Sequence, residues 1–306
     1  MIPLQVSLFG KFCARCGEKV VGNLDAYKVQ ELFCYLLLHA NQPHHREKLA
    51  GLLWEEQSAA QSKNYLRRTL WQLQNALKAQ ADDEPLLHVE PDWIQLDQTD
   101  SLWVDTAVFE LAFTQVNGKK GASLDETAVH NLIEAVSLYH GELLEGWYQN
   151  WCLFERERYR QMLLIMLDKL IAYCEGCGAY EIAITYGMEI LRCDLARERT
   201  HRQLMRLYYL RGDRTGAQRQ YERCKAILHD ELDVQPSAAT EQLRAQIEAD
   251  QLALPLLNSP GDGVNPANLQ DALQRLHNFD SILRQAHLEV QQEIQHIESA
   301  LSRFLR

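Results

Sequence analysis

The sequence has 306 residues, 46% of them hydrophobic, and a formal net charge of −11 at pH 7. This length suits two or three domains with real cores and argues against global disorder. So acidic a chain does not coat nucleic acid through bulk charge, and any DNA contact has to be local. Because no apolar run reaches membrane-spanning length and the first residues lack a signal-peptide pattern, we expect a soluble cytoplasmic protein.

The eight cysteines are spread along the chain, several among apolar, helix-like neighbours, which favours reduced cytosolic thiols. The pairs Cys13/Cys16 and Cys174/Cys177 have a spacing that zinc or a redox disulfide can use. They fall in separate predicted domains, and the first lies in a strand hairpin, so we interpret both as structural thiols. His44 and His45 belong to no compact ligand pattern.

No nucleotide-binding loop, dinucleotide-binding turn or nucleophile elbow occurs in the sequence. We therefore predict a protein that is not an enzyme and uses no cofactor or metal.

The N-terminal segment predicts a small antiparallel sheet. Residues 4–9 alternate apolar and polar, and residues 12–21 are broken at Gly17 as a hairpin would be. Helical spacing of apolar residues then predicts two short helices, over 28–39 and 46–54.

A third, longer helix is predicted from Ala59, with Ser58 as its N-cap. Its inward stripe consists of Leu66, Leu70, Leu73 and Leu77. Residues 86–89 and 93–96 flank a turn and predict a strand hairpin. Strands, three helices and a hairpin, in this order, are typical of a winged helix.

The pattern from 105 to 247 is almost wholly helical. Residues 178–183 and 212–217 resemble each other at an offset of 34 residues, the period of tetratricopeptide helix pairs. The fold class we expect is mainly α with a small β component. The predicted domains are a winged helix at 1–104, a tetratricopeptide-like helical domain at 105–250, a linker at 251–266 and a C-terminal helix at 267–306.

The C-terminal helix carries a heptad seam from Leu273 to Phe304, interrupted by Asp280 and His287. A coiled-coil homodimer and docking onto the chain's own helical domain both fit this pattern. Its expected oligomerisation positions are Leu276, Leu283, Val290, Ile294, Ile297 and Leu301.

Many modest matches in the right order make residues 4–248 resemble regulators of the Streptomyces antibiotic regulatory protein family. These combine an OmpR-type winged helix with a bacterial transcriptional activator domain. The matching stretches are 8–10, 28–39, 43–49, 53–54, 64–70, 103–109, 139–147, 155–158, 197–205 and 230–237. Two features depart from the family: the winged-helix half is mildly acidic, and Asp233 stands where glycine is common, although aspartate tolerates the left-handed conformation.

Placing the leucine stripe inward exposes the other side of the third helix to DNA. Amides can pair with adenine and arginine with guanine in the major groove, whereas flanking cations meet phosphates. The expected base-reading residues are Gln61, Asn64, Arg68, Gln72 and Asn75. The expected phosphate-positioning residues are Lys63, Arg67 and Lys78, and Trp93 follows the turn of the wing, where Glu90 and Asp92 repel phosphate.

These observations predict a sequence-specific transcription regulator that binds double-stranded promoter DNA. The resemblance implies an activator that recruits RNA polymerase from direct repeats, and we expect a homodimer without membrane contact. The alternative is an adaptor in a signalling complex that has lost DNA affinity, which the acidic charge balance favours. The polar face of the third helix favours DNA, because a docking module would carry apolar anchors there.

Overall fold

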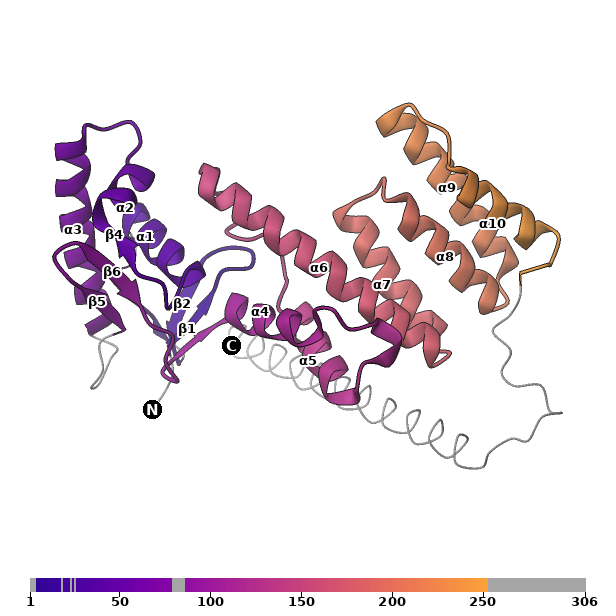
Figure 1. Cartoon of the computed structure of the whole chain (residues 1–306), viewed down its shortest axis with the longest axis horizontal. Helices are drawn as coiled ribbons and strands as arrows, with labels where there is room; N and C mark the ends of the chain where they lie inside the picture. Colours follow the sequence, from indigo (N-terminus) through magenta and orange to yellow (C-terminus); the bar gives the residue numbers. More distant parts are fainter. Residues whose placement is uncertain (1–3, 18, 23, 25, 79–85, 253–306) are drawn as a thin grey trace, which may run out of the picture. The chain divides into compact units, whose positions relative to one another are not determined.

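A computed structural model describes residues 4–17, 19–22, 24, 26–78 and 86–252. The chain divides into two compact units, residues 1–167 and 168–306, and the division falls within helix α6 (Asn150–Gly176). Figure 1 shows the elements of both units. No helix in the described ranges is long and apolar enough to cross a membrane.

The first unit opens with the expected antiparallel strands, β1 (Leu4–Ser7), β2 (Cys13–Cys16) and β3 (Lys19–Val20). A further strand, β7 (Leu102–Val104), was not predicted. It pairs in parallel with β1, Leu4 opposite Leu102, and gives the sheet the order β3-β2-β1-β7. The polypeptide therefore returns to its N-terminal sheet immediately before the helical half begins.

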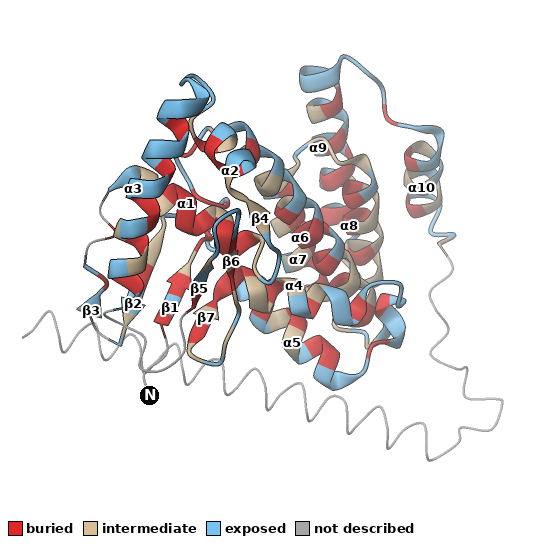
Figure 2. Ribbon diagram, turned by 60° about the vertical axis from the view of Figure 1, so that its left-hand side comes forward, coloured by how far each residue is buried: buried red, intermediate tan, exposed pale blue. Residues whose placement is uncertain are grey.

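Three helices follow β3 and confirm the predicted order: α1 (Tyr27–Leu38), α2 (Arg46–Leu53) and α3 (Ala59–Lys78). A second sheet, with order β4-β6-β5, contains the predicted hairpin β5 (Leu87–Val89) and β6 (Trp93–Leu96). The two-residue strand β4 (His44–His45), which pairs with β6, was not predicted. All four stripe leucines of α3 are buried, and Figure 2 shows the helix red on its inner side and blue on its outer side.

Asp105 joins the N-terminal sheet to the helical half. Its carboxylate accepts hydrogen bonds from the backbone N–H of Leu8 (2.8 Å), Phe9 (3.0 Å) and Thr106 (2.7 Å). Burial raises the pKa of Asp105 to about 6, although these three donors favour the charged form. Helix α4 (Asp105–Val116) begins here, followed by the 3₁₀ turn η1 (Gly121–Ser123) and α5 (Glu126–Ser137).

Helix α6 begins in contact with α1. The indole Nε1–H of Trp151 donates to Glu31 Oε1 at 3.3 Å, and the other carboxylate oxygen lies 2.7 Å from Lys28 Nζ. Glu31 is only 1% exposed, so these contacts compensate a charge removed from water. Within the first unit, α1 and the start of α6 are therefore joined by buried polar contacts.

The second unit contains the end of α6 together with α7 (Tyr180–Cys193), α8 (Glu198–Leu210), α9 (Arg214–Leu232) and α10 (Ala238–Glu248). The 34-residue offset marks equivalent turns: Gly178 (φ 74°) precedes α7 and Gly212 (φ 85°) precedes α9. Ala183 and Ala217, also 34 residues apart, are both fully buried. Small residues at these positions let the paired helices approach. The assignment of these pairs as tetratricopeptide-like stays a prediction.

Asp233 is the C-cap of α9 and adopts the left-handed conformation (φ 53°, ψ 39°), which aspartate tolerates. Its N–H donates to His229 O at 3.0 Å, and Val234 N–H donates to Leu228 O at 3.2 Å. This arrangement satisfies two carbonyls at the helix end. The linker from 253 onward and the heptad positions Leu276 to Leu301 lie outside the described residues.

Candidate nucleic-acid interface

The outer face of α3 is polar and exposed. Asn64, Arg68 and Asn75 point away from the buried stripe, together with Trp71, which is 64% exposed. These four residues lie on the side of the helix opposite the leucines because of the 100° rotation per residue. Trp71 adds a large flat group at the centre of this face.

Helix α3 also differs in charge from the rest of the chain. Its twenty residues include Lys63, Arg67, Arg68 and Lys78 but no aspartate or glutamate, whereas the whole protein is acidic. All four cations are exposed. Within the described ranges, neither Arg67 nor Arg68 has a carboxylate partner. Helix α3 therefore carries positive charge on a polar, exposed face.

Lys63 already forms an ion pair within the protein. Its Nζ lies 2.5 Å from Glu47 Oε1 on α2, and this hydrogen bond lowers the pKa of the Glu47 carboxyl. Both side chains are more than half exposed, so the pair is weak and leaves Lys63 available to a phosphate. Lys48, also on α2, is exposed and was not singled out from the sequence. The first helix of a helix-turn-helix crosses the DNA backbone, where such a cation is useful.

Two of the predicted base-reading residues are placed less favourably than the others. The carboxamide oxygen of Gln61 accepts from the Ser58 hydroxyl (3.0 Å) and faces the Ser58 N–H (3.4 Å), as in one half of a capping box. Ser58 is the residue before the first helical turn, since its C=O accepts from Ser62 N–H at 2.9 Å. Gln72 is half-buried. The outer face is therefore centred on Asn64, Arg68 and Asn75.

The segment from Leu86 to Val104, which includes the predicted wing hairpin of β5 and β6, has the opposite charge to α3. Residues 86–104 contain Glu90, Asp92, Asp97 and Asp100 and no lysine or arginine. Trp93 is 44% exposed, and its ring meets the His45 ring edge-on with centroids 5.3 Å apart. Among the described residues, none of the predicted α3 residues forms a hydrogen bond or an ion pair with Trp93.

The cysteine pairs lie in unrelated settings. Cys13 and Cys16 are on strand β2, whereas Cys174 is buried in α6, where burial raises its pKa to about 12. A thiol with so high a pKa is protonated and a poor nucleophile at neutral pH. Across the described ranges, no cluster of three histidine, cysteine or acidic side chains suits a metal ion.

Comparison with known proteins gives a match for the helical half. Residues 104–248 match the family described as the bacterial transcriptional activator domain. No curated protein sequence matches the chain. Among solved structures, the fold is similar to that of Mycobacterium tuberculosis EmbR in complex with a low affinity phosphopeptide, with a TM-score of 0.66 and 20% sequence identity over 90% of this chain and 71% of the EmbR chain.

The comparisons confirm the resemblance and the fold class predicted from the sequence. Residues 104–248 match the bacterial transcriptional activator domain, and the fold, mainly α with a small N-terminal β component, is similar to that of EmbR. The match over residues 104–248 supports a transcription regulator.

Proposed function

We propose that this protein is a sequence-specific DNA-binding transcription regulator that reads promoter DNA with α3. The observation that carries this proposal is the composition of α3, which has four exposed cations, no carboxylate and an amide-rich outer face in a protein of net charge −11. A major groove admits one helix, and local positive charge supplies the phosphate attraction that the whole chain lacks.

Within this proposal the residues of α3 divide into two roles. Asn64 and Asn75 read adenine and Arg68 reads guanine, because these side chains can form two hydrogen bonds to the base edges. Gln61 and Gln72 contribute only after a side-chain rearrangement, since one is engaged at the helix start and the other is half-buried.

The flanking cations Lys63, Arg67 and Lys78 contact phosphates and set the register of the helix. Trp93 lies in a wing whose carboxylates repel the DNA backbone, so the wing adds little to affinity.

We further propose that the protein acts in the cytoplasm as an activator and not as an enzyme. The activator domain at 104–248 supports recruitment of RNA polymerase at promoter direct repeats. Homodimerisation through Leu276, Leu283, Val290, Ile294, Ile297 and Leu301 places two α3 helices on such repeats. No cofactor enters this proposal.

The test begins with selection of genomic DNA fragments by the purified full chain. Binding of the enriched sequence is then measured against salt for the wild type, for the double variant Asn64→Ala/Arg68→Ala and for Arg15→Ala, an exposed cation of β2. Removing one good base contact costs about 1–3 kcal/mol, or about five- to 150-fold in affinity. The double variant should bind at least fivefold more weakly by this estimate, and Arg15→Ala should stay within about twofold.

The alternative function is an interaction adaptor without DNA affinity, which the acidic wing and net charge favour. This alternative predicts no enrichment of any sequence, even at low salt. It also predicts equal, weak binding of wild type and double variant, because only non-specific attraction would remain.

A further inference from the structure

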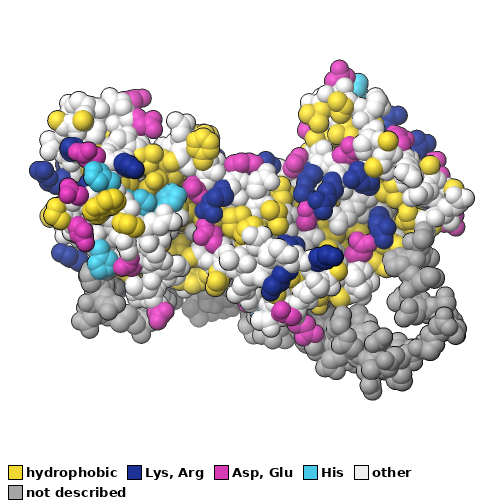
Figure 3. Space-filling model, in the orientation of Figure 1, with side chains coloured by type: hydrophobic (Ala, Val, Ile, Leu, Met, Phe, Trp, Pro, Cys, Tyr) yellow, Lys and Arg dark blue, Asp and Glu magenta, His cyan; other side chains and the backbone are white. Residues whose placement is uncertain are grey.

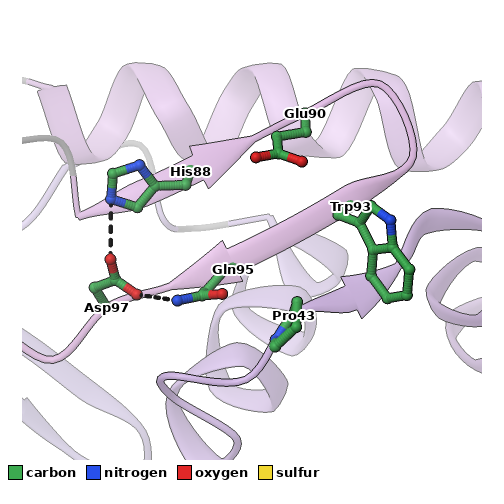
Figure 4. Close-up of a pocket in the computed structure, with 6 residues that line it drawn as sticks. All are labelled: Pro43, His88, Glu90, Trp93, Gln95 and Asp97. Atoms are coloured by element: carbon green, nitrogen blue, oxygen red, sulfur yellow. Dashed lines mark hydrogen bonds and ion pairs between the residues drawn. The ribbon is translucent and has the colours of Figure 1, made fainter.

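The wing carries a groove that the proposed DNA contact does not use. A cavity of about 450 Å³ is lined by Pro43, His88, Glu90, Trp93, Gln95 and Asp97, as Figure 4 shows. A second cavity, of about 260 Å³, includes Pro43 and Trp93 again, together with Tyr35, Leu49 and Leu52. Pro43 and Trp93 line both cavities, which are therefore neighbours on this face.

The first cavity is acidic. Glu90 and Asp97 line it, and no lysine or arginine does. Asp97 accepts a hydrogen bond from Gln95 (2.6 Å) and faces His88 (3.0 Å), whereas the Glu90 carboxylate makes no ion pair among the described residues. Glu90 lies beside the exposed Trp93 indole, and Asp97 lies at the other end of the cavity beside His88 and Gln95 (Figure 4). This arrangement attracts cationic side chains and repels a phosphate.

The second cavity has a mixed lining that includes His44, His45 and one cation, Lys48. Leu49 is buried there and Leu52 is half-buried. Lys48 disfavours a second cation in this cavity, so a positive group fits the first cavity, at Glu90, better than the second.

We propose that this groove docks a basic segment of a partner protein. One arginine or lysine of the segment lies against Trp93 beside Glu90, and a second basic side chain lies near Asp97. The choice of a protein over DNA follows from the charge of residues 86–104, four carboxylates and no cation. Figure 3 shows histidine, hydrophobic, acidic and some basic side chains over β4 and β6; among the basic ones, Arg46 donates to the Glu90 carbonyl at 3.1 Å.

The proposal is tested with the full chain labelled with 5-fluorotryptophan, whose six tryptophans include a reporter for each surface. Trp71 reports on the DNA-reading face of α3 and Trp93 on the groove, and Trp→Phe variants assign the two resonances. The probe is a capped hexa-arginine peptide. We expect it to shift the Trp93 resonance saturably and to leave the Trp71 resonance in place.

Variants that remove carboxylate charges inside and outside the groove provide the matched comparison of peptide binding. The double variant Glu90→Gln/Asp97→Asn should weaken peptide binding by about fivefold, since each exposed ion pair contributes about two- to fivefold. Asp100→Asn, an exposed carboxylate outside the groove, should change binding by less than about twofold.

Two results would overturn the proposal. Equal weakening by the groove variant and by Asp100→Asn would show general attraction to an acidic protein. A Trp93 shift caused by the enriched DNA and not by the peptide would show that the wing contacts nucleic acid. The Trp71 resonance, which should move with DNA alone, separates failure of this proposal from failure of DNA reading by α3.

Discussion

Replacing Asp105 by asparagine should change how the stability of the first unit depends on pH. The Asp105 carboxyl is buried against the backbone N–H groups of Leu8 and Phe9, and burial raises its pKa from 3.8 to about 6. A carboxyl with a raised pKa in the folded state contributes stability in full below pH 3.8. That contribution is lost as the pH rises through about 6.

The pKa difference of about two units corresponds to about 3 kcal/mol in total, of which about 1 kcal/mol is lost between about pH 5 and about pH 7. Asparagine does not titrate. The difference in the free energy of unfolding, wild type minus Asp105→Asn, should therefore be about 1 kcal/mol more favourable to wild type at the lower pH. The exposed Asp100→Asn serves as a control with no such change.

Urea unfolding followed by tryptophan fluorescence measures this difference selectively, because all six tryptophans precede residue 168 and thus lie in the first unit. A difference that stays constant with pH would refute the reasoning. A difference of opposite sign would show that the three N–H donors outweigh burial and hold the pKa of Asp105 below its ordinary value.

Three further predictions concern packing, pH and salt. A Cβ at Gly187 would lie 2.6 Å from Leu204 Cδ2, so Gly187→Ala should cost about 1–3 kcal/mol of stability in thermal unfolding. Adding Leu204→Ala should cost less than the sum of both changes, and strict additivity would contradict the close approach. Burial lowers the pKa of His201, whose Nδ1 accepts from the Gln220 amide at 2.8 Å. Protection of α8 and α9 amides from hydrogen exchange should therefore fall as the pH drops below 6.5, and unchanged protection would refute this. Arg67→Ala should reduce the salt slope of DNA binding by about 0.9, because the variant neutralises one phosphate fewer; an unchanged slope would place Arg67 away from the backbone.

Local patterns in the sequence were sufficient to predict the helices of the first unit. The leucine spacing of α3 predicts both the helix and its buried side, because one amphipathic helix docks in only one orientation. Asp233 could be placed in the left-handed conformation from its residue type and its position at a helix end. The 34-residue repeat was visible because equivalent turns use equivalent small residues.

Contacts between distant residues were not predictable in the same way. Strand β7 has three residues and no periodicity, and it exists because it pairs with β1 about a hundred positions earlier. The hydrogen bonds of Asp105 depend on that pairing. Gln61 illustrates a local competition: the same amide that could read a base can also serve the helix start, and helical angle alone does not distinguish the two.

The most direct test of DNA reading by α3 is the ratio of the affinity for the selected genomic sequence to the affinity for a shuffled copy, measured at one salt concentration. We expect a ratio of about a thousandfold or more for the wild type. The ratio should fall by at least fivefold in Asn64→Ala/Arg68→Ala while binding to the shuffled DNA falls less. A wild-type ratio near one, or a ratio that the double variant leaves unchanged, would contradict promoter reading by this helix.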